Sequence, residues 1–171
     1  MERFFIRSVI FGLSLDTYLT LYQRWLSESG MQFEGKEKFI NPDVYFEGTD
    51  YKKIKIENNV TISREVMFLI RDYSLNNAFC AMRNITIKRH EGEVYLLGNI
   101  SIGENTFIGA RVSMLTETTI GKNCIIGACS IVKGNITDNS ICIGNPCRII
   151  GNMVEYAEKH LKVKDYLEGS L

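Results

Sequence analysis

Large apolar residues recur at a strict six-residue interval in the second half of the sequence, at Ile102, Ile108, Met114, Ile120, Ile126 and Val132. Four positions after each of them comes a small or β-branched residue: Thr106, Val112, Thr118, Cys124, Ser130 and Ile136. A helix repeats its apolar residues about every 3.6 positions and a half-buried strand every second position, so this period belongs to neither. It is typical of a chain that alternates short strands and turns, with each hexad forming one side of a triangular coil. Because one coil cannot bury its inward face alone, the coils must stack.

The same interval extends less regularly toward the N-terminus. The probable inward residues there are Phe33, Ile40, Val44, Phe46, Ile56, Val60, Ile62, Val66 and Phe68. Residues 72–98 have no six-residue period, yet the period resumes at Ile102. An insertion that leaves the flanking repeat intact is a loop extending from the coil, and long loops of this kind are usually functional.

Helices are expected at both ends of the chain. Residues 1–29 are predicted to form a helical cap that Gly30 ends, with its apolar face at Leu15, Tyr18, Leu19, Tyr22, Trp25 and Leu26. Charged residues interrupt the first apolar stretch, so we expect no membrane span, and packing on protein is favoured over contact with a membrane surface. After the coils, residues 152–167 are predicted to form a helix with Asn152 as its N-cap, within a C-terminal helix and tail over 152–171.

Composition limits the remaining classes of protein. The 171 residues are enough for one domain with its own core, so we treat 1–171 as a single domain. Twenty basic and twenty acidic side chains cancel, which gives no reason to expect nucleic acid as a partner. The five cysteines are odd in number and include no C-x-x-C pair, so reduced thiols and a cytoplasmic location are expected.

The repeat, the interrupting loop and two sequence stretches together resemble the hexapeptide-repeat acyltransferases. The stretches are TISREVMFLIRDYS at 61–74 and IGNPCRII at 143–150, and the resemblance covers residues 31–151. It is closest to the O-acetyltransferases of polysaccharide and capsule assembly. The resemblance implies a mainly β fold, a left-handed parallel β-helix with an N-terminal helix, an extruded loop and a C-terminal helix. It also implies a homotrimer with active sites between subunits, acetyl-CoA as co-substrate without a metal, and a small-molecule or sugar acceptor.

The family pattern also suggests which residues bind acetyl-CoA. Small residues where the pantetheine arm approaches the coils correspond to Gly109, Ala110, Gly127 and Ala128. The other matching positions are Phe107 beside the acetyl group, Lys133 and Gly134 at the turn facing the nucleotide, Pro146 against the adenine and Arg148 at the ribose phosphate. Plain β-helix turns also use Gly and Ala, and Pro146 could simply end the last coil, so both interpretations stay open.

Catalysis is where the sequence departs from the family. A histidine that acts as general base is expected on the strand entering the loop, and Arg71 stands there. A guanidinium stays protonated and cannot accept the proton of a hydroxyl, although it could bind an anionic acceptor. The alternatives are His90 within the loop and Asp72, as an orienting carboxylate or as a base if burial raised its pKa; His160 is expected at the surface.

Two hypotheses follow: an active O-acetyltransferase, or a catalytically impaired homologue that keeps a CoA site or a scaffold role. A metal-dependent hydrolase is disfavoured because only two histidines are present.

Overall fold

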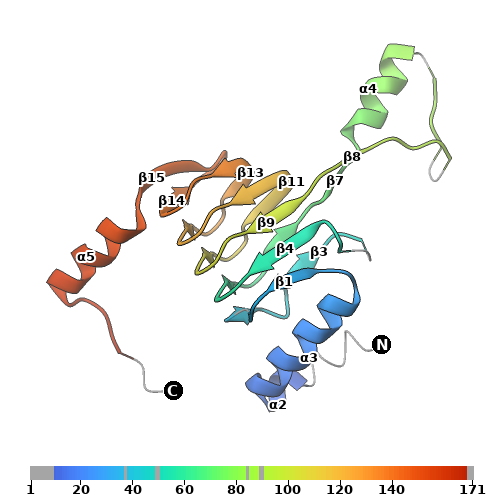
Figure 1. The fold of residues 1–171 in the computed structure, drawn as a ribbon. Helices are drawn as coiled ribbons and strands as arrows, with labels where there is room; N and C mark the ends of the chain where they lie inside the picture. Colours follow the sequence, from blue (N-terminus) through green and yellow to red (C-terminus); the bar gives the residue numbers. More distant parts are fainter. Residues whose placement is uncertain (1–9, 37, 49–50, 84, 89–90, 169–171) are drawn as a thin grey trace.

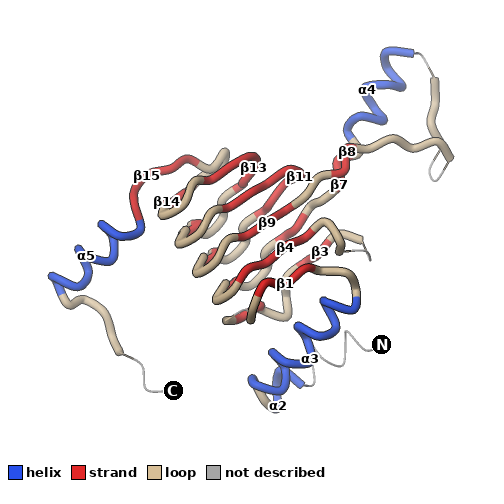
Figure 2. Tube along the Cα trace, viewed as in Figure 1, coloured by secondary structure: helices blue, strands red, loops and turns tan. Residues whose placement is uncertain are grey.

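The chain winds into a stack of triangular coils with helices at both ends and one long excursion (Figure 1). The computed structural model describes residues 10–36, 38–48, 51–83, 85–88 and 91–168. Short strands alternate with turns along the whole stack (Figure 2). Every pairing between coils is parallel, as expected for a chain that always winds in the same direction.

Three flat faces make up the stack. The first contains β2 (Phe39–Ile40), β5 (Thr61–Ile62), β10 (Phe107–Ile108), β12 (Ile125–Ile126) and β14 (Ser140–Ile143). The second contains β3 (Tyr45–Phe46), β6 (Met67–Phe68), the first part of β11 (Ser113–Ile120) and the start of β13 (Ile131–Ile136). The third contains β1 (Gln32–Glu34), β4 (Ile54–Glu57), β9 (Ile100–Ile102) and the last parts of β11 and β13.

The strand register confirms the predicted coil. Phe107 pairs with Ile125 and Ser113 with Ile131, so partners lie 18 residues apart, which is three hexads per coil. Thr61 pairs with Phe107 at a separation of 46 residues, because the excursion is inserted between these two coils. The six-residue interval therefore specifies both the three sides of each coil and the place where the stack is interrupted.

The core runs along the axis of the stack and contains the predicted inward residues. All six leading residues of the regular hexads are at most 1% exposed. The buried hydroxyls at the fifth position are satisfied by carbonyls of the coils: Thr106 Oγ1 donates to Gly121 O at 2.9 Å and Ser130 Oγ to Gly127 O at 2.6 Å. A buried hydroxyl without a partner would be costly, so these bonds allow small polar residues inside the stack.

One corner of the stack is lined by a ladder of asparagines. Asn59, Asn105, Asn123 and Asn139 all have φ between 54° and 59°, a left-handed conformation that Asn tolerates better than most residues. Each amide Nδ2 donates to the Oδ1 of the next coil, at 2.8 Å from Asn59 to Asn105 and at 3.0 Å for the two following steps. The ladder thus connects successive coils at the turn that Asn makes possible.

The N-terminal cap is confirmed for its described part. Helix α3 (Leu15–Glu28) follows the short α2 (Phe11–Leu13) and covers one end of the stack (Figure 1), burying Tyr18, Tyr22 and Leu26. Tyr18 Oη donates to the carbonyl of Ile40 at 2.6 Å. Residues 1–9 of the predicted cap lie outside the described residues. None of the helices in the described ranges has the length and apolar content needed to cross a membrane.

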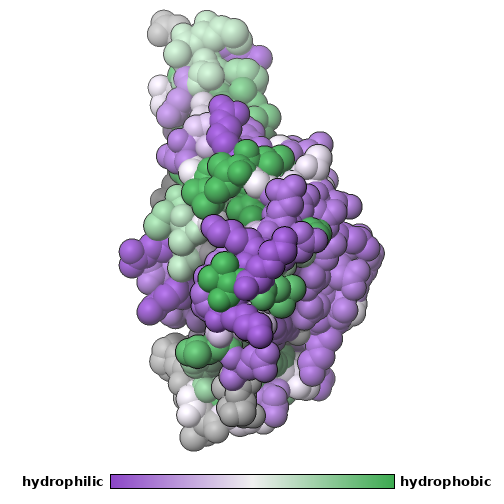
Figure 3. Space-filling model, turned by 90° about the vertical axis from the view of Figure 1, so that its left-hand side faces the viewer, coloured by the Kyte–Doolittle hydropathy of each residue, from purple (hydrophilic) through white to green (hydrophobic). Residues whose placement is uncertain are grey.

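The C-terminal segment turns back instead of adding another coil. Strand β15 (Arg148–Asn152) pairs antiparallel with β14, although the resemblance extended the coils to residue 151. Helix α5 (Met153–Val163) follows, and Asn152 Oδ1 accepts from Val154 N at 2.8 Å, which confirms the predicted N-cap. The helix ends before residue 167 and contains no buried residue. On this face, hydrophobic patches lie between hydrophilic ones (Figure 3).

The cysteines differ in part from the expectation of five reduced thiols. Cys142 and Cys147 are joined in a disulfide, because the turn between β14 and β15 brings their Cα atoms to 5.7 Å, within the usual range for a bridge. Cys80, Cys124 and Cys129 are free. Burial raises the pKa of the Cys124 thiol, which fits its inward position as a small apolar residue.

Candidate functional site

The excursion, here defined as residues 71–97, leaves the stack as an antiparallel pair of strands. Strand β7 (Arg71–Asp72) pairs with β8 (Leu96–Leu97), and helix α4 (Ser74–Arg83) lies beyond them, far from the coils (Figure 1). The loop predicted for 72–98 is therefore present but contains a helix that was not predicted. Gly98 N donates to Ile70 O at 3.0 Å, which closes the base of the excursion.

Arg71 lies at this base, at the position where the sequence resemblance implied a histidine. Its backbone N–H donates to Glu47 Oε2 at 2.8 Å. Its guanidinium carbon lies 5.7 Å from the ring centre of Tyr95, and a Cβ added to Gly48 would come within 3.2 Å of a terminal guanidinium nitrogen. Within the described ranges, Arg71 Nε is buried without a hydrogen-bond partner. The structure thus places a fixed cation, and no proton acceptor, at this position.

Asp72 ends strand β7, two residues before α4 begins. Its Oδ1 accepts from Ser74 N at 2.9 Å. Hydrogen bonds from the side chain and backbone of Ser74 hold the pKa of Asp72 below its ordinary value, and the Lys133 ammonium contributes a smaller part. Within the described chain, burial therefore does not raise the pKa of Asp72, which favours the other predicted role, that of an orienting carboxylate. The carboxylate stabilises the first turn of α4.

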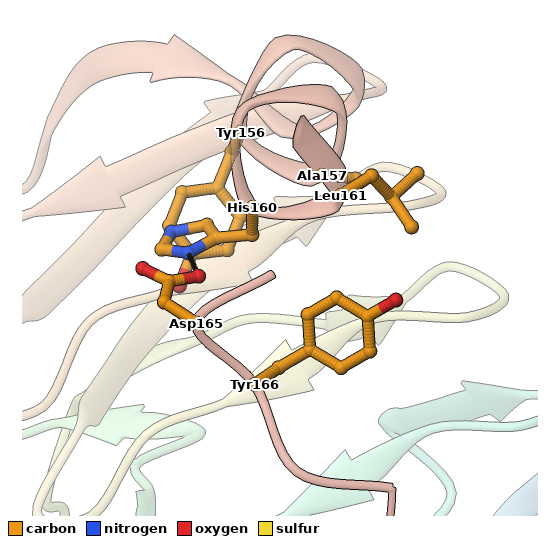
Figure 4. A pocket seen from close by; sticks show the side chains of 6 residues that line it. All are labelled: Tyr156, Ala157, His160, Leu161, Asp165 and Tyr166. Atoms are coloured by element: carbon orange, nitrogen blue, oxygen red, sulfur yellow. Dashed lines mark hydrogen bonds and ion pairs between the residues drawn. The ribbon is translucent and has the colours of Figure 1, made fainter. Parts of the chain in front are cut away.

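The two histidines are placed very differently. His160 lies on α5 in a pocket of about 500 Å³ lined also by Tyr156, Leu161 and Tyr166 (Figure 4). Its Nδ1 is 2.6 Å from Asp165 Oδ1, at the opposite end of the molecule from α4 (Figure 1). His90, the candidate base in the loop, lies outside the described residues.

The small residues predicted to face CoA divide into two kinds. A Cβ on Gly109 would lie 2.6 Å from Ala128 N, and one on Gly127 would lie 2.5 Å from Ile143 Cγ1. These two glycines are therefore required by the packing of the next coil. Ala110 and Ala128 are half-buried and exposed respectively, so their surface is accessible to a ligand. Phe107, on the first face, is 43% exposed.

The remaining predicted CoA residues lie at two places near the C-terminal end of the stack. Lys133 and Gly134 are in β13, and a Cβ on Gly134 would meet nothing within 4 Å, which leaves room beside the Lys133 ammonium. Pro146 lies in the turn after β14, and Arg148 is exposed at the start of β15. Of these four residues as the structure describes them, Lys133 is the one whose charge contributes to the lowered pKa of Asp72.

Metal binding has no support in the described part of the chain, where no three His, Cys, Asp or Glu side chains come together in a way that could hold a metal ion. The aromatic residues around Arg71 were missed by the sequence analysis. Tyr95 and Tyr73 have ring centres 5.0 Å apart, and Asn76 Oδ1 accepts from Val94 N at 2.6 Å to join α4 to the returning segment. Arg71 and Tyr73 come close to Tyr95 because β7 pairs with β8, and this pairing is not visible in the sequence.

A family model described as the bacterial transferase hexapeptide (six repeats) matches residues 99–134. Residues 99–134 therefore match the sequence repeat that this model describes. No curated protein matches the sequence. A Vibrio cholerae hexapeptide-repeat acetyltransferase in complex with acetyl-CoA is similar in structure, with a TM-score of 0.63 and 18% identity over 88% of this chain and 82% of that one.

Two further solved structures extend the comparison. A galactoside acetyltransferase in complex with CoA has a TM-score of 0.61 and 23% identity, over 98% of this chain and 84% of its own. A maltose O-acetyltransferase from Clostridium difficile has a TM-score of 0.54 and 20% identity, over 89% and 86%. At these identities the similarity shows the fold alone, and it confirms the left-handed β-helix and the mainly β class expected from the sequence.

Proposed function

We propose that this hexapeptide-repeat protein transfers an acetyl group from acetyl-CoA to a hydroxyl or amine of a sugar or surface-polysaccharide precursor. The observation that carries the proposal is the β-helix itself, interrupted once by a long excursion whose base presents a charged, aromatic cluster. Structures with this fold have been solved with acetyl-CoA or CoA bound. The accessible Ala110 and Ala128 and the open space beside Lys133 are compatible with an extended thiol ester lying along the stack.

The reaction needs the acceptor and the thioester in one complex. The acceptor oxygen forms a bond to the acetyl carbon, the bond from carbon to sulfur breaks, and the hydroxyl proton is finally carried by the CoA thiol. Holding both reactants in place supplies much of the rate, and backbone N–H groups stabilise the oxyanion. The guanidinium of Arg71 cannot accept a proton, and the lowered pKa of Asp72 makes its carboxylate a weak base, so His90 is the remaining predicted candidate for the proton transfer.

A homotrimer with active sites between subunits is part of the proposal. Neither α4 nor α5 has a buried residue, although both contain apolar side chains. Met82 is 69% exposed and Leu161 is 59% exposed. Apolar helical faces of this kind are usually covered by protein, and neighbouring coil stacks would cover them. We place the protein in the cytoplasm, where acetyl-CoA is available.

A second candidate is a catalytically impaired homologue that binds CoA or acts as a scaffold. The observation that favours it is Arg71, because a guanidinium cannot replace a histidine as general base. In that case acetyl-CoA binds to the coils, and no acceptor is acetylated at an enzymatic rate.

Acetyl transfer to a panel of charged and neutral sugars, followed by mass spectrometry of the acceptors, tests the two candidates. The proposed function predicts an acetylated product that disappears in His90→Ala and persists in His160→Ala. Binding of CoA by calorimetry without any acetylated product supports the impaired homologue. A sharp gain of activity in Arg71→His, starting from none, identifies the loss of a base as the cause.

A further inference from the structure

We propose that Arg71 is the acceptor-recognition residue and binds an anionic group, a carboxylate or a phosphate, carried by the acceptor sugar. The inference rests on the proposed function and names the substrate class of the same site. It places a specificity-determining cation where relatives of this kind place a base, so the acceptor is expected to carry the charge that complements it.

Two neighbours limit the space around the guanidinium. The centre of the Tyr95 ring lies 5.7 Å from the guanidinium carbon, and the terminal nitrogens occupy space next to Gly48 where a Cβ would meet them. Gly48 has a φ of +78°, and a Cβ there would press on both terminal nitrogens at 3.2 and 3.3 Å. A cation held in this way loses little conformational freedom when it binds an oxyanion.

Among the described residues, no carboxylate forms an ion pair with Arg71, and its Nε is buried with no acceptor. The carboxylate of Glu47 accepts from the Arg71 backbone N–H, and that of Asp72 accepts from Ser74 N. A planar fork of donors without an internal acceptor matches the geometry of a carboxylate or phosphate.

Other arginines show what the chain does when a guanidinium is structural. Arg111 Nε lies 2.6 Å from Glu65 Oε2, and Arg24 Nε lies 2.9 Å from Glu28 Oε1. Arg83, near the end of α4, stacks on Phe79 with its guanidinium carbon 4.9 Å from the ring centre. Arg71 is stacked in the same way as Arg83, but its Nε is removed from solvent as well. Unlike Arg111 and Arg24, Arg71 has no carboxylate partner among the described residues, so its terminal nitrogens can take an external anion.

Aromatic rings beside the cation provide a surface for a sugar ring. Tyr73 and Tyr95 are 39% and 40% exposed, and their ring centres are 5.0 Å apart. Each ring offers an apolar face and a hydroxyl that can donate or accept. A cation next to two accessible tyrosines therefore fits a ligand that combines a hydrogen-bonding ring with one negative charge.

The test compares charged and neutral probes of the same ring geometry. Binding of a methyl glucuronide, a hexose phosphate and a methyl glucoside is measured by calorimetry in saturating CoA, with the full chain. The wild-type protein is expected to prefer at least one charged probe, and Arg71→Gln is expected to weaken that probe by about 10- to 100-fold. The neutral probe and CoA itself should bind the variant as before.

Two controls separate recognition from folding. Arg83→Gln removes a stacked arginine from the same excursion and should leave all affinities unchanged. Arg71→Lys keeps the charge but not the fork, so it should retain only part of the preference. A preference for the glucuronide or for the phosphate distinguishes the two anions.

The assignment is overturned if charged and neutral probes bind wild type equally, if no charged probe binds, or if Arg71→Gln weakens CoA instead. Because binding is measured separately from transfer, the two proposals fail in different ways. Acetylation of neutral sugars that does not depend on Arg71 rejects this inference and keeps the proposed function. Selective binding of a charged probe without any acetyl transfer keeps this inference and rejects the proposed function.

Discussion

In the coils, each regular hexad buries its leading residue almost completely, whereas helix α4 in the excursion buries none. The coils are joined to each other by parallel ladders on three faces, whereas the described strands of the excursion, β7 and β8, form a separate two-stranded sheet. The comparison shows that the repeat supplies the buried core, whereas the excursion adds little to it. In the proposed function, the repeat is the scaffold and the excursion carries the residues that recognise the acceptor.

The largest expected difference between the two regions lies in their apolar side chains. Ile126→Ala, in the core of the stack, should lower the free energy of unfolding by about 2–5 kcal/mol, because it removes buried methylene groups and leaves a cavity. Leu75→Ala, on half-buried α4, should have a much smaller effect on global unfolding. Denaturant titration measures both, and equal losses would show that the excursion is part of the cooperative core.

The next effect concerns the glycines of the coils. Gly109→Ala places a Cβ 2.6 Å from the backbone of Ala128, so the two coils must separate, at a cost of about 1–3 kcal/mol. Gly12→Ala in α2 is the matched control, because a Cβ there meets nothing within 4 Å. The midpoint temperature of thermal unfolding should fall for Gly109→Ala and stay unchanged for Gly12→Ala. An unchanged midpoint for Gly109→Ala would mean that this glycine is kept for a ligand.

A pair of asparagines sharpens the comparison further. Asn105→Ala removes two side-chain hydrogen bonds of the ladder at a left-handed turn. It should lower the free energy of global unfolding by about 1–2 kcal/mol. Asn76→Ala, which removes the bond to Val94 N, should increase hydrogen exchange only within the excursion. Asn105→Gly separates the turn from the ladder, since Gly keeps the conformation and loses the bonds. Faster hydrogen exchange throughout the coils in Asn76→Ala would show that the excursion and the coils unfold together.

The smallest effect is expected at the surface of the stack. Arg111 holds the pKa of Glu65 below its ordinary value, so the pair stabilises the fold above the normal carboxyl range and loses this contribution as pH falls through the lowered pKa. Glu65→Gln should therefore lower the unfolding midpoint slightly at neutral pH and not at strongly acidic pH. A difference in midpoint between Glu65→Gln and the wild type that grows as the pH falls would contradict this account of the pair.

Much of the scaffold could be predicted because every hexad of the repeat needs a buried apolar residue at the same position. Each of the regular hexads places an apolar residue at the axis, so the three-sided coil, its core and the point of interruption all follow. The asparagine ladder becomes visible only once the coil length is known, since Asn105 and Asn123 are one coil apart.

The excursion has no such redundancy. Leu75, Phe79 and Met82 have helical spacing, but a ten-residue helix without buried residues leaves a weak pattern. The stacking of Arg71 on Tyr95 depends on an antiparallel pairing between residues 24 positions apart, which no periodicity indicates. The disulfide between Cys142 and Cys147 depends in the same way on a single turn.

The most direct test of the central claim is a crystal structure of the full chain with CoA and a charged acceptor analogue. The account predicts CoA along the edge that contains Ala110 and Ala128, with its sulfur facing the base of an excursion and the anion of the analogue within hydrogen-bonding distance of Arg71. A CoA molecule bound away from that edge, or an Arg71 guanidinium that contacts neither ligand, would contradict the account.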